Sequence, residues 1–419
     1  MTRSRITLIW ICVLFSNFIY AQTFTKPIGC FAGTNGINAE VLSHEESGGS
    51  LLIAHWGDIE PSPGVFDFTA LQEKIDLITS SGKKYALAVG AGTFGSPEWL
   101  LNDPDIPTIS FNYQNNDFIL PFWWDEYVLQ RMDLMINRIG EEFSEDESLS
   151  HIYITQMTTN GVEGHLNGVD MNTYKQLGFT NDKWIEAAQH TTATFVDAFP
   201  NHPLVFEIHE IDRDTIVPAL LMDYFYNNPA YCQRLGLGMW WISGKTSYQT
   251  NLIEYIREFE GDKYAQVIGR SDQPQRFQDS MYSTVFAQAK ELGFRYIEPW
   301  PYEFQHHTHD ELFEDFNAWA EANFTSLDSC QSISYSEEIY TREVNIFPNP
   351  AINSIQIKHD STLDLKEATI ISIDGIHYYR NTCLNSQIVI SSYPSGIYFI
   401  ELEFSDGSKA IKKFVKSNY

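Results

Sequence analysis

Basic residues are scarce in this sequence. Of its 419 residues, 27 are Lys or Arg and 55 are Asp or Glu, so the formal net charge is −28. Binding of nucleic acid through its phosphates requires the opposite sign, which argues against that class of function. An anionic membrane surface is disfavoured for the same reason. The excess of acidic side chains is typical of a soluble protein.

Cysteine is also scarce, with five residues in the chain. Cys30, Cys232, Cys330 and Cys383 follow the N-terminal segment. None of them forms a CxxC pair or has the spacing of metal ligands. We therefore predict neither a metal nor a cofactor. Cys30 and Cys330 lie at the two ends of the longer domain and could form a disulfide there, but isolated buried thiols are an equally good interpretation.

Long apolar runs are absent after the N-terminus. The one such run, Ile6–Tyr20, follows Arg3 and Arg5 and precedes Ala21. A basic start, a short apolar core and a small residue at its end are typical of a secretory signal peptide. The run is too short to span a membrane comfortably. We predict that residues 1–21 are a signal peptide, and we predict no transmembrane segment after its removal.

Aromatic residues, in contrast, are abundant. They make up 14% of the chain and include 10 Trp and 22 Tyr, within an apolar content of 43%. This composition predicts a globular protein with a substantial core. The aromatic surplus also suits a sugar-binding site, because flat rings stack on the apolar faces of pyranoses. Packing in the core is the alternative for any single ring.

A polar, Ser-rich segment divides the chain into two predicted domains. Residues 326–338 have little periodic apolar pattern, which predicts a linker. After it, short stretches alternate apolar and polar residues, the pattern of strands with one buried face. We predict a small all-β sandwich over residues 339–419. Its predicted strands are Ser354–Lys358, Glu367–Ile373, Gln387–Ile390, Gly396–Phe404 and Lys409–Val415.

The C-terminal segment carries three specific motifs. They are Pro348-Asn349-Pro350 at its start, Gly396-Ile397-Tyr398 in its middle, and the basic end with Lys412, Lys413 and Lys416. With these motifs the segment resembles the type A sorting domain of the type IX secretion system of Bacteroidetes. The resemblance implies that the secretion machinery is a partner and that the protein crosses both membranes to be secreted or held at the cell surface. A carbohydrate-binding sandwich is the alternative.

Strand-like and helical patterns alternate over residues 22–325. Alternating strands and helices imply a parallel sheet, and eight units of this total length predict an α/β fold of the (β/α)8 TIM-barrel class. An open doubly wound sheet is less consistent, because no Gly-rich phosphate loop opens a helix. The predicted strands are Ile28–Ala32, Leu51–His55, Lys84–Ala91, His151–Met157, Leu204–Ile208, Gly236–Ile242, Tyr264–Gly269 and Arg295–Pro299.

Acidic, aromatic and histidine side chains gather where these strands end. Chemistry in such barrels takes place at the carboxyl ends of the strands. One carboxylic acid, one carboxylate and rings that hold a sugar are the parts needed for glycoside hydrolysis. The rim candidates are Trp56, Asp58, Asn160, Glu163, His165, Glu207, His209, Glu210, Trp240, Trp241, Ser271, Asp272, Glu298, Trp300 and Glu303.

A second resemblance covers the stretch from Trp56 to Leu100. The segments HWGDIEPSPGVFDF and SPEWLL are similar to clan-A glycoside hydrolases, in the style of family 42 β-galactosidases and of cellulase-like barrels. The resemblance implies an O-glycosyl hydrolase with a catalytic Glu after an Asn at the end of the fourth strand. Glu60, within the turn of this motif, is predicted to hold the start of a helix and not to touch substrate.

Glu163 is our prediction for the catalytic acid/base. Asn160 and Glu163 both follow the fourth predicted strand, but two residues separate them where the clan has an adjacent pair. The clan's nucleophile is a Glu at the end of the seventh strand, and that strand has none here. We predict Glu298, in an apolar strand, as the second carboxylate, because a buried acid is costly unless it is paired or functional. Glu210 and Asp272 are the alternatives.

Further rim residues are predicted to bind substrate. Only one of the adjacent Trp240 and Trp241 can face inward, because side chains alternate along a strand. The histidines at 306, 307 and 309 could ligate a metal, but their place on one loop favours solvated side chains. The predicted substrate-binding residues are Trp56, Asn160, His165, His209, Glu210, Trp240, Asp272 and Trp300.

The sequence thus predicts a secreted glycoside hydrolase that cleaves an extracellular poly- or oligosaccharide with two carboxylates. A non-catalytic glycan-binding barrel is the main alternative, because the clan motifs are incomplete. A polysaccharide lyase is a weaker one.

Overall fold

The chain folds into two compact units that divide between Gln331 and Ser332. The computed structural model describes residues 22–113, 115–231, 233–330, 344–359, 364–372, 377–381, 387–405 and 409–417. The predicted signal peptide, residues 1–21, lies outside the described residues, as do Cys232 and Cys383.

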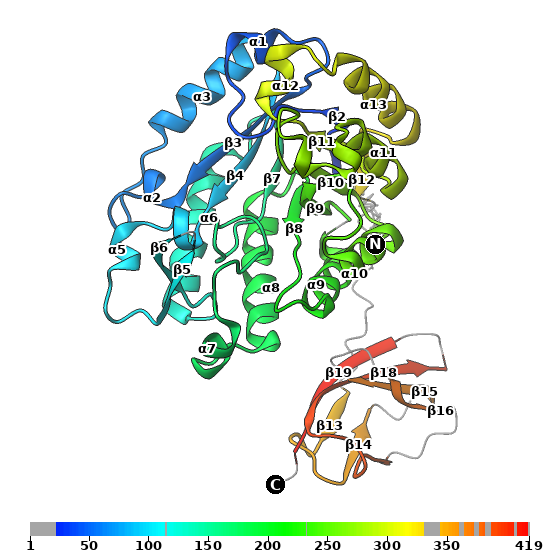
Figure 1. Cartoon of the computed structure of the whole chain (residues 1–419). Helices are drawn as coiled ribbons and strands as arrows, with labels where there is room; N and C mark the ends of the chain where they lie inside the picture. Colours follow the sequence, from blue (N-terminus) through cyan, green and yellow to red (C-terminus); the bar gives the residue numbers. More distant parts are fainter. Residues whose placement is uncertain are drawn as a thin grey trace, which may run out of the picture. The chain divides into compact units, whose positions relative to one another are not determined.

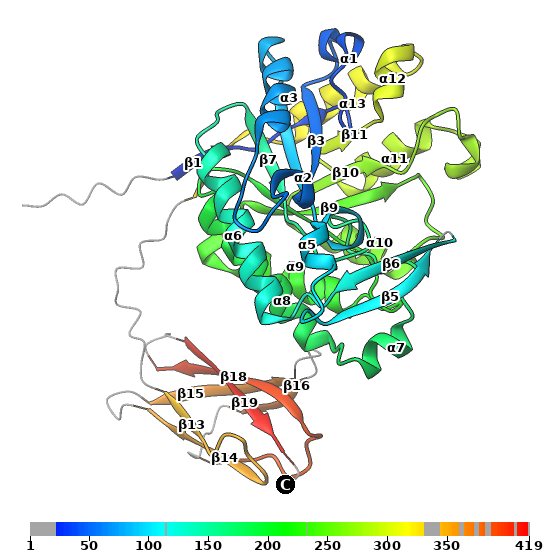
Figure 2. The ribbon, with the colours of Figure 1, turned by 90° about the vertical axis from the view of Figure 1, so that its left-hand side faces the viewer.

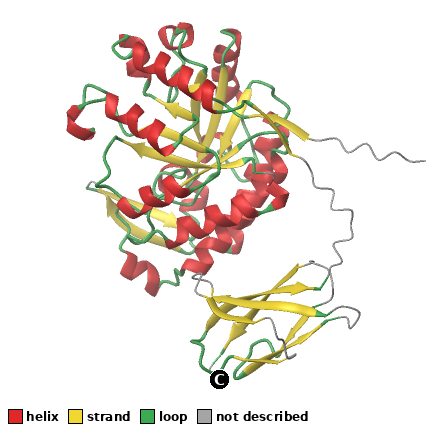
Figure 3. Cartoon of the chain, turned by 90° about the vertical axis from the view of Figure 1, so that its right-hand side faces the viewer, coloured by secondary structure: helices red, strands yellow, loops and turns green. Residues whose placement is uncertain are grey.

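The first unit is a closed barrel of eight parallel strands, as predicted. Their order is β2-β11-β10-β9-β8-β7-β4-β3, and a parallel bridge from Ala32 to Ser50 joins the first strand to the last. Figure 3 shows the strands at the centre with helices around them. The strands are β2 (Gly29–Cys30), β3 (Gly49–His55), β4 (Lys84–Gly90), β7 (Leu149–Tyr153), β8 (Leu204–Glu207), β9 (Leu235–Ile242), β10 (Lys263–Val267) and β11 (Tyr296–Glu298).

Helices follow the strands and cover the outside of the barrel (Figure 1). Among the described residues, no helix combines the length and apolar character needed to cross a membrane. The helices are α1 (Ala39–Ser43), α2 (Trp56–Ile59), α3 (Thr69–Ser80), α4 (Gly92–Gly95), α5 (Glu98–Leu101), α6 (Glu126–Phe143), α7 (Met171–Gln176), α8 (Asn181–Ala198), α9 (Ile216–Asn227), α10 (Thr250–Glu258), α11 (Ser283–Leu292), α12 (Pro301–His306) and α13 (Asp310–Asn323), with short 3₁₀ turns η1 (Pro229–Tyr231), η2 (Pro274–Arg276) and η3 (Gln278–Ser280).

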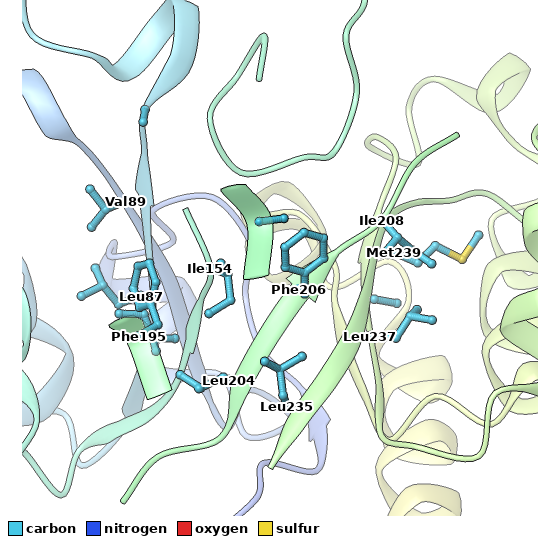
Figure 4. Close-up of a cluster of buried hydrophobic side chains, with 14 of the residues drawn as sticks. Leu87, Val89, Ile154, Phe195, Leu204, Phe206, Ile208, Leu235, Leu237 and Met239 are labelled. Carbon is cyan, nitrogen blue, oxygen red and sulfur yellow. The ribbon is translucent and has the colours of Figure 1, made fainter. Parts of the chain in front are cut away.

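The main core lies between the strands and the surrounding helices. Strands of a parallel barrel are buried on both faces and therefore read as continuous apolar runs, and all residues of β9 are buried. Asp125 caps the N-terminus of helix α6, because its carboxylate accepts the N–H groups of Tyr127 and Val128. Figure 4 shows side chains of β4, β8 and β9, among them Leu87, Phe206 and Leu237, packed in this layer.

The barrel interior holds a second, aromatic-rich cluster. Tyr153, Trp240, Tyr264 and Tyr296 belong to it. Trp241, one residue further along β9, packs in the outer core instead. The prediction that only one Trp of the pair faces inward is therefore confirmed.

A β-hairpin lies in the loop between β4 and α6, where the sequence pattern predicted no element. Strands β5 (Thr108–Tyr113) and β6 (Asn116–Pro121) pair antiparallel. Figure 2 shows the hairpin beside α5 and α7. A Cβ atom on Gly168 would lie 2.8 Å from Cβ of Tyr113, so this hairpin packs closely on the loop after β7.

Part of the predicted linker is a strand. β12 (Leu327–Cys330) pairs antiparallel with β1 (Gln22–Thr25), so residues 327–330 of the predicted linker form a strand of the first unit. A polar sequence concealed this strand, because backbone pairing does not require apolar side chains. Residues 331–338 of the predicted linker lie outside the described residues. Cys30 is a free buried thiol, so the possible disulfide with Cys330 is not formed.

The second unit consists of two small antiparallel sheets, as predicted. One has the order β13-β14-β17 and the other β16-β15-β18-β19. Apolar side chains such as Ile355, Ile370 and Leu402 form its separate core. Two short strands, β13 and β16, were not predicted. The strands are β13 (Asn345–Phe347), β14 (Ser354–Lys358), β15 (Leu365–Ser372), β16 (His377–Asn381), β17 (Gln387–Val389), β18 (Gly396–Phe404) and β19 (Lys409–Lys416).

Candidate active site

Glu163 lies in the loop after β7, at the carboxyl end of the barrel strands. Asn160 organises this loop, because its Oδ1 accepts the N–H groups of Val162 at 3.2 Å and Glu163 at 2.8 Å. Its Nδ2 donates to Oε1 of Glu163 at 2.8 Å. The hydroxyl of Thr158 donates to the carbonyl of Glu163 at 2.6 Å. The side chain of Glu163 is thus held in place by its own loop.

Two histidines flank the carboxylate of Glu163. Nε2 of His165 lies 3.5 Å from Oε2 of Glu163, and Nε2 of His209 lies 4.0 Å from the same atom. The carboxylate keeps 23% of its side-chain surface exposed. Glu163 is therefore a carboxyl group that solvent or a ligand can reach, with a nitrogen donor on either side.

Burial raises the pKa of Glu163 to about 7. The neighbouring imidazole of His209 acts in the opposite direction, and the carboxylate of Glu207 reinforces the rise. The hydrogen bond from Asn160 and the charge of Arg276 lower the pKa by smaller amounts. A carboxyl group with a pKa near neutrality can hold a proton and release it at ordinary pH, which suits a general acid.

Glu207, the last residue of β8, is fully buried behind this group. Its Oε2 accepts the backbone N–H of Gly164 at 2.7 Å and faces Nδ1 of His209 at 3.0 Å. Its Oε1 accepts the backbone N–H of Trp240 at 3.1 Å. This one carboxylate therefore connects β8, β9 and the loop that carries Glu163.

A pocket of about 610 Å³ opens beside the two histidines. Its lining is mostly polar and comes from the loops after β7, β8 and β9. Tyr248 is 48% exposed there, and its ring meets that of Trp241 edge-on with centroids 5.5 Å apart. A pocket of this size is in the range of small-molecule sites. Its principal side chains are His165, His209, Glu210, Arg213, Tyr248 and Gln249.

Glu298, the predicted second carboxylate, ends β11 inside the barrel and is fully buried. Its Oε1 accepts the hydroxyl groups of Tyr153 at 2.9 Å and Tyr296 at 2.8 Å, and its Oε2 accepts the amide of Gln266 at 3.0 Å. Burial raises the pKa of Glu298 to about 7, although these three hydrogen bonds oppose the rise. The described residues show no hydrogen bond between Glu298 and Glu163.

The other predicted site residues fall into three groups. Asn160, His165 and His209 lie around Glu163, and His165, His209 and Glu210 line the neighbouring pocket. Trp240 and Trp56 are buried, at 5% and 0% exposure. Trp300 and Asp272 follow β11 and β10 on other loops of the rim.

Trp56, predicted to bind substrate, belongs to the core in this structure. Its indole N–H donates to Oε2 of Glu60 at 2.6 Å. Glu60 also accepts the N–H of Gly64 at 2.7 Å and forms an ion pair with Arg131. Glu60 is fully buried and holds this turn, which agrees with the prediction that it does not touch substrate.

Trp300 and Asp272 keep partly exposed side chains at the rim. The indole N–H of Trp300 donates to the carbonyl of Val267 at 2.7 Å, which fixes the ring at the end of β10. Asp272 forms a two-point ion pair with Arg270, at 3.1 and 2.8 Å. Asp272 is therefore neutralised locally by its neighbour.

Comparison with known proteins identifies both units. Residues 47–119 match the family model of glycoside hydrolase family 42, described as β-galactosidase. Residues 345–417 match the model of the secretion system C-terminal sorting domain. The barrel is a family-42-like glycoside hydrolase domain. It is followed by a type IX secretion sorting domain, which implies secretion across the outer membrane. Both resemblances noted in the sequence are thereby confirmed.

Solved glycoside hydrolases resemble this chain only distantly, and no curated protein matches it. The catalytic domain of β-amylase from Paenibacillus polymyxa is 8% identical, with a TM-score of 0.49 over 72% of this chain and 100% of that one. The cold-adapted β-galactosidase from Rahnella sp. R3 is 10% identical, with a TM-score of 0.49 over 71% and 58%. Xylanase 10B from Thermotoga petrophila RKU-1 is 12% identical, with a TM-score of 0.46 over 69% and 95%. These values are too low to indicate a substrate.

One further cluster in the glycoside hydrolase domain has the composition of a metal site. His44, His307 and Asp310 place ligand atoms within 4.8 Å of one another. However, Nδ1 of His44 accepts the backbone N–H of Glu46 at 3.2 Å. Nε2 of His44 then carries the proton and donates it to Asp310 at 3.1 Å. A metal would have to displace that proton, so the hydrogen bonds explain this cluster without an ion.

Sequence reasoning placed Glu207 among the rim acids of this hydrolase but gave it no role. The sequence did contain a signal for such a role. Glu207 ends an apolar strand and His209 follows two residues later, so both side chains should point to the same face. Tyr248, Gln249 and Arg213 gave no comparable signal. They lie in long loops, and only the folded chain brings those loops together.

Proposed function

We propose that this protein is a secreted glycoside hydrolase that cleaves O-glycosidic bonds of an extracellular poly- or oligosaccharide, with Glu163 as its general acid. The observation that carries the proposal is the position of Glu163, a partly exposed carboxyl group between two histidines at the rim of a glycoside hydrolase barrel, where burial raises its pKa to about 7. Cleavage begins when a carboxylic acid protonates the oxygen of the leaving group. Glu163 can be protonated at neutral pH and is still exposed enough to meet that oxygen.

Of the three acids considered for the second carboxylate, Asp272 is paired with Arg270 on another loop. The other two, Glu298 and Glu210, differ in access. Glu298 was the sequence prediction, but it is fully buried under three hydrogen-bond donors. Burial raises its pKa to about 7, whereas the charged partner of the acid has to be ionised at neutral pH. Glu210 lines the pocket beside His209. Access to a sugar favours Glu210, while Glu298 needs its covering side chains to move before it can reach an anomeric carbon.

The pocket supports a carbohydrate as the ligand. Its polar side chains offer donors and acceptors for hydroxyl groups, and the exposed ring of Tyr248 offers a flat apolar face. Sugars present both kinds of surface, so a few polar groups beside one rigid ring fit them. The ring of Tyr248 packs edge-on against Trp241, whose indole N–H donates to the carbonyl of Ile208 at 3.1 Å.

Export of the enzyme follows from its two ends. The signal peptide predicted over residues 1–21 would take the chain across the inner membrane, and the sorting domain would direct it across the outer membrane. The substrate is therefore expected outside the cell.

The test is a screen of the purified protein against a panel of polysaccharides, with product anomers followed by NMR. We expect release of reducing sugars from at least one neutral polysaccharide, and loss of that activity by several orders of magnitude in Glu163→Gln. Glu314→Gln, an exposed acid on α13, is the matched control and should retain activity. Binding without cleavage by the wild-type protein would support the non-catalytic alternative instead.

A further inference from the structure

The two histidines beside Glu163 differ at their second ring nitrogen. Nδ1 of His209 faces the buried carboxylate of Glu207 at 3.0 Å. Nδ1 of His165 accepts the backbone N–H of Asn167, at 3.4 Å. A carboxylate at Nδ1 keeps a proton there and stabilises the imidazolium, whereas a backbone donor does neither. The same kind of side chain is therefore placed in two opposite electrostatic settings.

The charges of the two rings follow from these settings. Burial lowers the pKa of His165 to about 3, so this ring is neutral at neutral pH. Burial is the largest single effect on the pKa of His209 and acts in the same direction, but the charge and hydrogen bond of Glu207, together with the charges of Glu163 and Glu210, raise this pKa above its ordinary value. His165 lies nearer to Glu163, yet His209 is the ring whose surroundings favour the protonated form.

We propose that Glu207 is a positioning residue for the general acid Glu163. It holds His209 in the protonated form, with Nε2 facing Glu163, and it fixes the loop of Glu163 through the N–H of Gly164. This inference rests on the proposed role of Glu163. It assigns to Glu207 a function that it exerts through His209 and not by contact with the sugar.

The loop is packed tightly enough for Glu207 to act on it. A Cβ atom on Gly164 would lie 3.1 Å from the backbone nitrogen of His209 and 3.3 Å from the carbonyl oxygen of Glu207. The amide of Gln156 donates to the carbonyls of Val162 and Glu207, at 2.8 and 2.7 Å. The loop and the end of β8 are thus joined by both backbone and side-chain bonds, and they should move together.

Several elements present charged or titratable groups to Glu163. The charge of His209 lowers the pKa of Glu163 more than the charge of Glu207 raises it. If Glu207 becomes neutral and His209 then loses its proton, the larger effect disappears and the pKa of Glu163 rises. The groups that face this carboxylate or its histidines are Asn160 and His165 on its own loop, Glu207, His209 and Glu210 at the end of β8, Tyr248 after β9, and Arg276 in η2.

The first readout is the pH profile of kcat/KM, whose basic limb reports deprotonation of the acid in the free enzyme. In Glu207→Gln we expect this limb to move to higher pH by about one unit, the size of shift that a nearby charge produces. His209→Gln should move it at least as far, because Glu207 then keeps its charge. His165→Gln is the matched control, because it removes a neutral ring. The basic limb of its kcat/KM profile should lie at the same pH as in the wild type, even if turnover falls.

The second readout needs no substrate. NMR of ¹⁵N-labelled histidine rings reports the protonation of each imidazole. The signal of His209 is identified because it is missing from the spectrum of His209→Gln. We expect an imidazolium at pH 7 in the wild-type protein and a neutral ring in Glu207→Gln. This spectrum also shows whether the variant is folded, and Glu207→Asp, which keeps the charge, should restore part of the imidazolium signal.

The outcomes separate this inference from the proposed function. If Glu163→Gln is inactive but Glu207→Gln leaves both the basic limb and the charge of His209 unchanged, the role of Glu207 is refuted while the hydrolase mechanism stands. If Glu163→Gln is fully active, the mechanism fails, and the NMR spectrum alone then decides whether Glu207 charges His209.

Discussion

Oε2 of Glu207 lies 3.0 Å from Nδ1 of His209 and 2.7 Å from the backbone nitrogen of Gly164. One carboxylate oxygen thus joins a strand end to the loop that carries Glu163. Because Glu207 is fully buried, this connection is protected from solvent and should be strong. The acid that is proposed to do the chemistry therefore depends on a residue that a substrate does not reach.

The identity of the second carboxylate is the first prediction. Glu210→Gln should reduce turnover by several orders of magnitude, because Glu210 lines the pocket. Glu298→Gln should keep measurable turnover but lose stability, because one of its two acceptor oxygens becomes an amide donor and the hydrogen bonds from Tyr153, Tyr296 and Gln266 have to rearrange. Steady-state kinetics measure the turnover of both variants, and thermal unfolding measures their stability.

Azide provides the control for this assignment. A small anion can enter the space left by a removed nucleophile and attack the anomeric carbon, so it should restore activity only to the variant that lacks the nucleophile. If Glu298→Gln is inactive, remains folded and is rescued by azide while Glu210→Gln is fully active, Glu298 is the partner of Glu163 and our preference for Glu210 is wrong.

The second prediction concerns the stability contributed by Glu298. Burial raises the pKa of Glu298 in the folded protein from 4.5 to about 7. Between these pH values the folded state binds more protons than the unfolded state, so this group lowers stability as the pH rises. The free energy of unfolding of the wild type, relative to Glu298→Gln, should fall by roughly 1–3 kcal/mol between pH 5 and pH 7.5.

Urea unfolding followed by Trp fluorescence measures this effect in the barrel. Every Trp after residue 21 lies between Trp56 and Trp319, within the first unit. Parallel pH dependences in the two proteins would show that Glu298 titrates as an ordinary carboxyl group.

The third prediction concerns Trp300. Its ring is partly exposed at the rim and held by a hydrogen bond to Val267. Trp300→Ala should weaken substrate binding by about 1–3 kcal/mol while the fold survives, since stacking and burial of one ring are of that size. Calorimetric titration of an inactive Glu163→Gln background avoids turnover during the measurement.

Trp319 offers a matched control for this prediction. It is also partly buried against the main core, but it lies on α13. Trp319→Ala should lower stability and leave affinity unchanged. Equal affinities of the Trp300 and Trp319 variants for the true substrate would assign both rings to packing.

The fourth prediction concerns the sorting domain. The two units have separate cores, so a chain that ends after Gln331 should keep its fold and activity. It retains β12 and therefore its pairing with β1. It should not leave its native cell, because it lacks the domain that matches the sorting family. Activity assays of cell fractions and medium measure this.

A fusion gives the reciprocal control. Residues 332–419 attached to a periplasmic reporter should direct that reporter across the outer membrane. Equal amounts of the truncated and the full-length chain in the medium would contradict an export role.

The eight barrel strands and the second domain could be predicted from the sequence because their signals are local. Continuous apolar runs such as that of β9 mark strands buried on both faces, and alternating runs such as Ser354–Lys358 mark strands with one buried face. β12 escaped prediction because its backbone pairing with β1 joins residues about 300 apart in the chain.

For the site, the sequence determined which acids reach the rim, since strand ends are local features. It could not determine the surroundings of those acids. Glu163 and Glu298 are both rim glutamates in the sequence, yet one is partly exposed beside two histidines and the other is enclosed by two tyrosines and a glutamine. Only the tertiary structure decided this difference, because burial, charge and hydrogen-bond partners come from strands and loops that are distant in the chain.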